Sequence, residues 1–209
     1  MTNRNVQDFG MPTYLHRPTQ AEFDDHTTNI DAHMRDFLQL LRTGEYLGFP
    51  FCRGSEDWAI SANTLYAVPL LIARNVTIDR IAINVVAAGA AGTKGRLGVY
   101  KTGTNLYPGA LVIDGGEVAV DAIAVVAAII DQALTEGLYF CVLVSNGTPT
   151  IKTLYSTWAA MGVSAADLTG PNGAWYIAFT YAALPDPFPA GATFLNHTPV
   201  IIPRIKSLD

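Results

Sequence analysis

Residues 90–112 read AAGTKGRLGVYKTGTNLYPGALV, and two interpretations of this stretch lead to different folds. A phosphate-binding loop needs a lysine directly after its second glycine, then serine or threonine, then a helix. Here Thr93 separates Gly92 from Lys94, a further glycine follows, and the sequence continues with the pattern of a strand. The stretch is therefore interpreted as a hairpin connection, a strand, a turn at Tyr107-Pro108-Gly109 and a second strand.

Similar short apolar segments, separated by turn residues, follow one another from Trp58 onward. In residues 76–86 the alternation of apolar and polar residues slips by one position at Asp79–Arg80, which indicates a β-bulge. About eight to ten short strands with regular turns predict a mainly β protein, an antiparallel β-sandwich of jelly-roll type, over residues 58–209. The expected strands are 63–73, 76–86, 95–102, 109–120, 122–130, 137–146, 149–155, 173–181 and 199–208, with large loops at 156–172 and 184–199.

The segment before the sandwich has the signals of a single α-helix. Thr19 and Glu22 form a capping box, and Gly44 is a natural C-terminal stop, so the helix is predicted at 19–44. It could lie on its own domain as an amphipathic helix, or form a short parallel coiled coil between identical chains. Spacings that alternate strictly between four and three residues favour the coiled coil. The predicted trimerisation residues are Phe23, Thr27, Ile30, Met34, Phe37 and Leu41.

A coiled coil of about three heptads is weak alone, so a larger trimeric domain would have to support it. Phenylalanine at the d positions is also easier to place in a trimer than in a tight dimer. On either side of the helix, residues 1–18 are expected to form an extended arm because Pro12 and Pro18 favour extended backbone. Residues 45–57 mix glycine, proline and aromatic residues and are interpreted as a connector.

Composition excludes several classes of protein. Half of the residues are hydrophobic and only 15% are charged, which indicates a folded chain, and the net charge of −5 argues against nucleic acid as a partner. The apolar run 123–130 is too short to span a bilayer, and the N-terminus lacks the apolar core of a signal peptide. Cys52 and Cys141 are expected to be free thiols. We therefore expect a soluble protein made in a reducing cytoplasm.

No motif of a catalytic, cofactor-binding or metal site stands out. The histidines are His16, His26, His33 and His197, and no His-Glu-x-x-His, Cys-x-x-Cys or Gly-x-Ser-x-Gly pattern is present. A glycosidase would need two carboxylates that face each other across a groove. The acidic residues Asp114, Glu117, Asp121, Asp131 and Glu136 are instead scattered near strand ends. The chain is expected not to be an enzyme and to need no cofactor.

Aromatic residues gather in the last third of the chain. They are Tyr155, Trp158, Trp175, Tyr176, Tyr181, Phe188 and Phe194. Tryptophan and tyrosine in loops bind sugars or proteins, although packing in the core and between subunits is the alternative for such a group. Tyr155 and Trp158 begin the long loop and are predicted to form an exposed pair that contacts a receptor.

Five sequence elements together resemble the β-sandwich modules of tailed-phage tail fibres and related virion appendages. They are a strand ending in Val-Pro, the VTIDRI strand, the Arg-Leu-Gly-Val-Tyr strand, the Tyr-Pro-Gly turn before Leu-Val, and the GLYFCVLVS strand. These elements cover residues 63–154, and Phe140 and Cys141 stand where an aromatic pair or tryptophan is common in such modules. The N-terminal part of the chain matches nothing in this scheme.

The resemblance implies a homotrimer with an N-terminal anchor, a short helical bundle and a distal β domain. The expected protein is a structural component of a phage virion, made in the host cytoplasm, and most simply a tail or baseplate fibre. Residues 1–18 would dock on another virion protein, and the sandwich would bind a host-surface glycan or protein, without nucleic acid or membrane insertion. A head fibre or capsid decoration protein of the same layout is the alternative, and a glycan-processing enzyme is a weaker one.

The coiled coil can be tested directly. Replacing Ile30→Asp together with Phe37→Asp puts charges into the apolar seam, so the double variant is expected to lose assembly. Light scattering should find three chains for the unaltered protein and fewer for the variant. An unchanged trimer in the variant would show that the helix does not organise the assembly.

Overall fold

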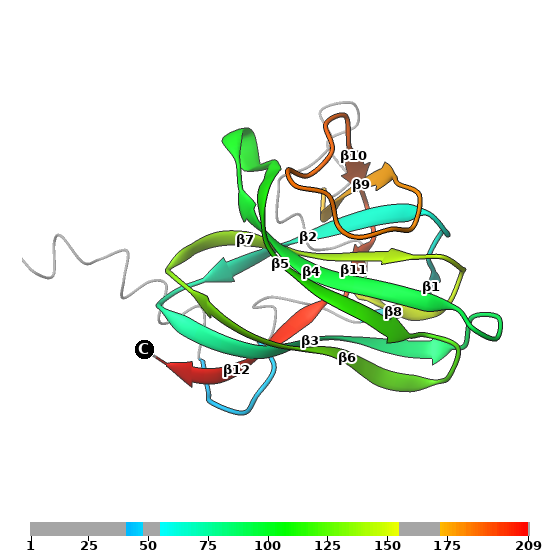
Figure 1. The fold of residues 1–209 in the computed structure, drawn as a ribbon, viewed down its shortest axis with the longest axis horizontal. Coiled ribbons are helices and arrows are strands. Elements are labelled where there is room, and N and C mark those ends of the chain that lie inside the picture. Colours follow the sequence, from blue (N-terminus) through cyan, green and yellow to red (C-terminus); the bar gives the residue numbers. More distant parts are fainter. Residues whose placement is uncertain (1–40, 48–54, 155–171, 209) are drawn as a thin grey trace, which may run out of the picture. The chain divides into compact units, whose positions relative to one another are not determined.

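The computed structural model describes residues 41–47, 55–154 and 172–208, and these form two antiparallel β-sheets that face each other (Figure 1). The predicted β-sandwich is confirmed. The arm 1–18 and residues 19–40 of the predicted helix lie outside the described residues. Residues 41–44, which the sequence assigns to the end of that helix, are not helical. In the described part of the chain, no helix has the length and apolar character needed to cross a membrane.

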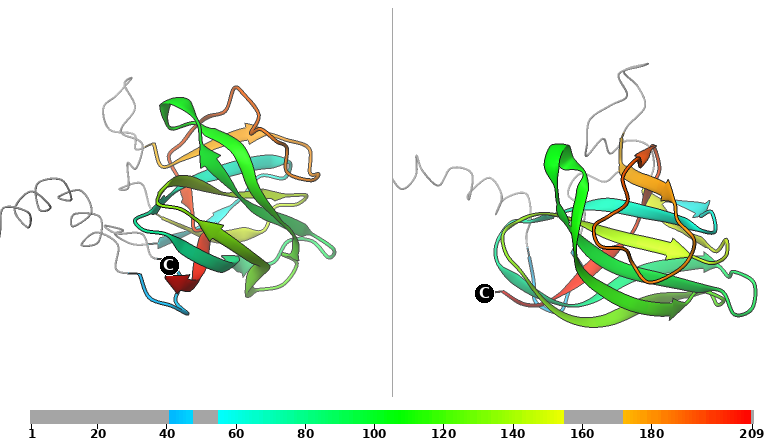
Figure 2. Two further views of the ribbon diagram at one scale, coloured as in Figure 1. Left: turned by 60° about the vertical axis from the view of Figure 1, so that its left-hand side comes forward. Right: turned by 45° about the horizontal axis from the view of Figure 1, so that its top comes forward.

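The described residues place six strands in each sheet. The first sheet, here called sheet A, contains β1 (Ser55–Ala59), β3 (Val76–Ala87), β6 (Ala124–Leu134), β8 (Thr150–Leu154), β11 (Thr198–Pro199) and β12 (Ile202–Leu208). Sheet B has the order β10 (Thr193–Leu195), β9 (Ala174–Ala178), β2 (Thr64–Ile72), β7 (Gly137–Ser145), β4 (Lys94–Thr102) and β5 (Pro108–Ala119). The two further views in Figure 2 show the sheets as separate layers.

Nine strands form close to their predicted positions, and three further strands were not predicted. β1 begins inside the segment 45–57 that was expected to be a connector, and β10 and β11 lie inside the expected loop 184–199. Each is only two to five residues long, and β1 and β10 are end strands of their sheets. Strands this short present too few residues for an alternating pattern to stand out.

The predicted bulge in β3 is confirmed. In the pairing with β12, β3 contains one residue more than its partner, because Ile78 lies opposite Ile205 and Arg80 lies opposite Arg204. Both Ile78 and Ile81 are buried. The extra residue turns both Asp79 and Arg80 away from the core, where Arg204 of β12 binds the Asp79 carboxylate with two nitrogens. The one-residue slip in the sequence therefore creates a charged pair on the outer surface of sheet A.

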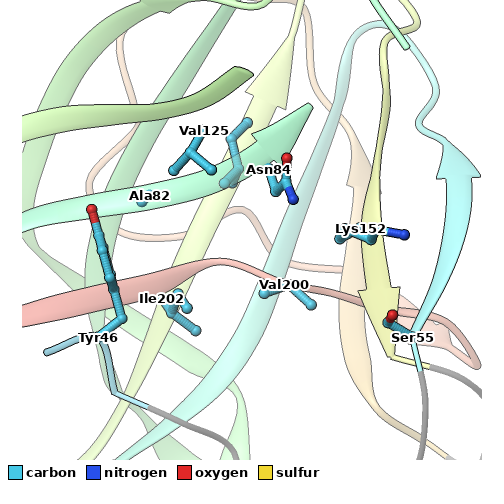
Figure 3. A pocket seen from close by; sticks show the side chains of 9 residues that line it. Tyr46, Ser55, Ala82, Asn84, Val125, Lys152, Val200 and Ile202 are labelled. Carbon is cyan, nitrogen blue, oxygen red and sulfur yellow. The ribbon is translucent and has the colours of Figure 1, made fainter. Parts of the chain in front are cut away.

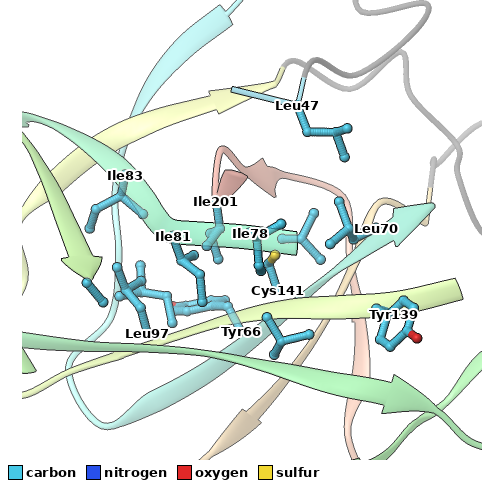
Figure 4. Close-up of a cluster of buried hydrophobic side chains, with 14 of the residues drawn as sticks. Leu47, Tyr66, Leu70, Ile78, Ile81, Ile83, Leu97, Tyr139, Cys141 and Ile201 are labelled. Carbon is cyan, nitrogen blue, oxygen red and sulfur yellow. The ribbon is translucent and has the colours of Figure 1, made fainter. Parts of the chain in front are cut away.

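The main core fills the space between the two sheets (Figure 4). Tyr66 from β2, Ile81 from β3, and Leu97 from β4 are fully or almost fully buried there. Cys141 also lies in this core, and burial raises the pKa of its thiol to about 12, so it packs as a small apolar side chain. The expectation of a buried free thiol holds for Cys141, whereas Cys52 lies outside the described residues.

A second apolar cluster covers the outer face of sheet B. Phe140 and Val142 of β7 point to this side, opposite to Cys141, and Leu184 and Phe188 from the loop at 179–192 cover them. β7 is therefore buried on both faces, which explains why its sequence is almost continuously apolar.

The stretch 90–112 is not a phosphate loop, but its first part is also not a hairpin connection. Residues 88–93 join β3 of sheet A to β4 of sheet B, so they cross between the two layers. The amide of Gly92 donates to the Asp121 carboxylate at 2.9 Å, and the amide of Lys94 donates to the Asn146 side chain at 2.8 Å. The amide groups that a phosphate loop would offer to a ligand therefore donate their hydrogen bonds to side chains of the protein itself. The second part is the predicted hairpin, β4 and β5, but the turn predicted at Tyr107-Pro108-Gly109 is wrong. The connection is a 3₁₀ turn at Thr104–Leu106, and Pro108 and Gly109 already belong to β5.

The glycine of the Arg-Leu-Gly-Val-Tyr strand is required by its surroundings. A Cβ atom at Gly98 would collide with Leu184 and lie 2.6 Å from the carbonyl oxygen of Ile113. Gly98→Ala should therefore destabilise the fold by about 1–3 kcal/mol, because the covering loop must move. Urea unfolding measures the loss.

Gly95→Ala in the same strand is the control, since its Cβ would meet only side-chain atoms, at 3.3 Å or more. Equal stability of the two variants would contradict the requirement for glycine at position 98.

Candidate functional site

Most residues predicted to have a functional role lie outside the described residues. These are Tyr155 and Trp158, and the trimerisation residues Phe23, Thr27, Ile30, Met34 and Phe37. Leu41 is described, and it packs against the main core of the sandwich. It belongs to the segment 41–47, in which the amide of Gly44 donates to the carbonyl of Ile205 and the amide of Leu47 donates to that of Pro203. The segment 41–47 thus adds backbone pairing to β12.

Among the described residues, exposed apolar side chains lie on β6 and in the bend directly before it. Ile123, Val125 and Ile129 are 72%, 64% and 69% exposed, and alternate residues of β6, such as Ala128, face the core. β6 pairs with β3 and is an end strand of its sheet in the described part of the chain. Large apolar side chains on both faces are typical of a strand buried on both sides, yet one face of β6 is open. We call Ile123, Val125 and Ile129 the β6 ridge.

A hollow of about 470 Å³ lies beside the ridge on the same face (Figure 3). It forms where β3 and β8 diverge, because these strands pair only near Val85–Ala87. β11 then continues along β8, and β12 continues along β3. The side chains that line it are Ala82, Ile83, Val125, Val200 and Ile202, with Tyr46, Ser55, Asn84 and Lys152 as its polar members. Val125 belongs to both the ridge and the hollow.

Charged groups on this face form pairs of opposite sign. Lys152 lies 2.6 Å from Asp57, and Lys206 lies 2.8 Å from Asp131. The Arg204 guanidinium binds Asp79, and this hydrogen bond holds the pKa of the Asp79 carboxyl below its usual value. These ion pairs surround an apolar centre, so the face has the character of a protein-protein contact surface.

Two of the acidic residues that the sequence scatters near strand ends, Asp114 and Glu117, have a structural role. Asp114 lies 2.8 Å from Arg96, and it accepts a hydrogen bond from the amide of Leu184. The hydroxyl of Tyr181 donates to Glu117 and lowers the pKa of that carboxyl, whereas a glycosidase acid needs a raised pKa. Together these contacts fasten the covering loop at 179–192 to the β4–β5 hairpin. Within the described ranges, no three metal-ligating side chains cluster.

The aromatic group of the last third is mainly a packing cluster. Trp175 stacks on Phe194 with ring centroids 3.9 Å apart, contacts Tyr107 edge-on, and donates its indole N–H to the carbonyl of Leu106. Trp175 and Phe188 are buried, while Phe194 and Leu106 are nearly half exposed. These contacts brace the tip of the β4–β5 hairpin against β9 and β10. The packing role that the sequence analysis gives as the alternative for this group therefore holds for Trp175 and Phe188, while the partners of each ring could not be named from the sequence because they lie far apart along the chain.

The Asp79–Arg204 pair predicts a dependence of stability on pH. Because the folded-state pKa of Asp79 is lowered, its contribution is present above the ordinary value of 3.8 and is lost as pH falls through the folded-state value. The stability difference between the unaltered protein and Asp79→Asn should therefore be larger at about pH 6 than at about pH 2.5. Urea unfolding at both pH values measures it. A difference that does not change between them would contradict the ion pair.

Comparison with known proteins identifies no relative of this chain. No protein-family model matches it, and neither a curated protein nor a solved structure matches it. The function is therefore argued from the chain's own residues.

Proposed function

We propose that this chain is a structural protein of a phage virion, a homotrimeric fibre of the tail or baseplate. In this proposal residues 1–18 dock on another virion protein, and the sandwich is presented to a glycan or protein on the host surface. The observation that carries the proposal is the open apolar face of sheet A, with its exposed β6 ridge and its hollow. A surface of this kind on a rigid sandwich suits a protein that works in an assembly.

The positions of the recognised motifs support the same class of protein. The Arg-Leu-Gly-Val-Tyr and GLYFCVLVS segments are β4 and β7, which pair with each other in the middle of sheet B. The VTIDRI segment is the bulged part of β3, and Pro108 and Gly109 of the Tyr-Pro-Gly segment begin β5. The motifs therefore specify how the sandwich is built, and their resemblance to virion modules concerns the scaffold rather than a particular receptor.

The coiled coil remains part of this proposal in a shortened form. Because residues 41–44 are not helical and Leu41 packs on the sandwich, the apolar seam would end at Phe37. A seam this short gives weak association alone, so the sandwiches would have to contribute contacts of their own. Three sandwiches on one axis would then bind a host surface through several weak contacts at once, which gives firm attachment without a deep pocket.

The proposal is tested on virus particles and on host cells. Full-length protein, added in excess, should reduce the adsorption of a phage that encodes this chain, since it would occupy the same receptors. Heat-unfolded protein is the control and should have no effect. Gold-labelled antibodies against the chain should mark the tail or baseplate in electron micrographs.

Each outcome separates the alternatives. Label on the head, with no competition for adsorption, would select the head fibre or decoration protein. Particles without label would overturn the virion proposal. Sustained release of reducing ends from host polysaccharide would instead indicate a glycan-processing enzyme.

A further inference from the structure

We propose that the outer face of sheet A is the surface through which copies of this chain bind one another. The face consists of the β6 ridge (Ile123, Val125 and Ile129) and the adjacent hollow. This inference rests on the proposed homomultimeric fibre and names the contact that the sandwiches would make within it.

The ridge is the first reason. Val125 and Ile129 lie on β6, an end strand of the described sheet, and Ile123 lies in the bend directly before it; each of these β-branched side chains is at least 64% exposed. A monomeric protein usually places charged or polar residues at such positions, because an open apolar row on an end strand promotes association. On β1, the opposite end strand of sheet A, the exposed residues include Ser55 and Asp57 instead. The contrast between the two ends of the sheet points to a partner at β6.

The shape of the face is the second reason. A projecting apolar ridge and an apolar hollow lie side by side and share Val125. One copy can therefore place Ile123 or Ile129 into the hollow of the next copy, and the same contact can repeat. A contact between two different parts of the same surface closes into a ring when the rotation between copies permits it. The face thus contains both the projecting side chains and the hollow that would receive the side chains of another copy.

Charge and area favour a second copy over other partners. The charges around the face occur as pairs of both signs, Lys152 with Asp57 and Lys206 with Asp131, which suits neither a polyanion nor an anionic lipid surface. The face is formed by the six strands of sheet A, which contain 42 described residues. At about 3.3 Å per residue and about 4.8 Å between strands, it covers roughly 670 Å². A standard interface buries about 800 Å² on each partner.

The path of the chain is the third reason. The segment 41–47 pairs with β12 through Tyr46 and Arg204, and Tyr46 lines the hollow. The segment 41–47 therefore lies beside this face. The outer face of sheet B is already covered by the loop at 179–192.

The test uses the full-length chain and the variants Ile129→Lys and Val125→Lys/Ile129→Lys. Both positions are open to solvent, so the variants should fold, and circular dichroism and the urea midpoint check this. We expect the dissociation constant between copies to rise at least about ten-fold in the double variant, measured by light scattering over a dilution series. Hydrogen exchange at β6 should become faster in the variant at equal protein concentration.

Leu106→Lys is the matched control, because Leu106 is an exposed apolar residue of the β4–β5 hairpin in sheet B. Its association should equal that of the unaltered protein. Association as tight in the double variant as in the unaltered protein, with unchanged exchange at β6, would overturn the proposed face. Equal weakening by Leu106→Lys would overturn it as well.

One further variant separates this inference from the proposed fibre. The variant Ile30→Asp/Phe37→Asp lacks the apolar seam, so any remaining association between copies would come from the sandwiches. If that association depends on protein concentration and is lost when Ile129→Lys is added, it takes place at the face. If the face variants assemble normally and the unaltered protein still competes for adsorption, the proposed contact at the face is wrong. The fibre proposal would remain. Unaltered protein that is a single chain even at about 100 µM would overturn both the face and the homotrimer.

Discussion

The burial of β7 on both faces is the constraint on which the rest of the sandwich depends. Tyr139, Cys141 and Leu143 face sheet A, whereas Phe140 and Val142 face outward and need a cover of their own. The loop at 179–192 supplies it, and polar contacts hold that loop in place. The hydroxyl of Tyr100 donates to the carbonyl of Pro185, and the Asp114 carboxylate and the Glu117–Tyr181 pair fasten neighbouring residues. Acidic residues near strand ends thus stabilise the cover of the second core.

This arrangement makes the two outer faces of the molecule different. Sheet B is closed by its own chain, while the outer face of sheet A carries an apolar ridge and a hollow with no cover among the described residues. The bulge at Asp79–Arg80 contributes to this difference, because it brings charged side chains to the surface where Arg204 can pair with them. The face is therefore bordered by paired charges.

The sequence predicts the sandwich well because long strands show a recognisable alternation of apolar and polar residues. The alternation in 76–86 predicts both β3 and its bulge, and the turn residues between segments place most strand ends within a few residues. Prediction from the sequence fails where a segment's structure depends on strands that lie far away along the chain. β1 and β10 pair with strands far along the chain and are too short for a pattern, and residues 88–93 cross between layers, although a hairpin was expected.

The candidate site shows the same limit. The run 123–130 is visibly apolar, but whether a strand is covered on one face or two depends on what packs there, and local sequence does not contain that information. The predicted contact residues Tyr155 and Trp158 fall outside the described part of the chain. The sequence shows an apolar run at 123–130, but only the structure shows that β6 is an end strand of the described sheet with exposed apolar residues.

The hollow in sheet A also depends on strands that lie far apart along the chain. Its wall combines residues of β3 with Val200 and Ile202, which a ribosome adds only after most of the sandwich has been made. Until then β3 lacks its β12 partner, and the hollow lacks part of its wall. If copies bind one another through this face as proposed, the contact could form only after β12 has been synthesised, so a nascent chain would be kept from premature assembly.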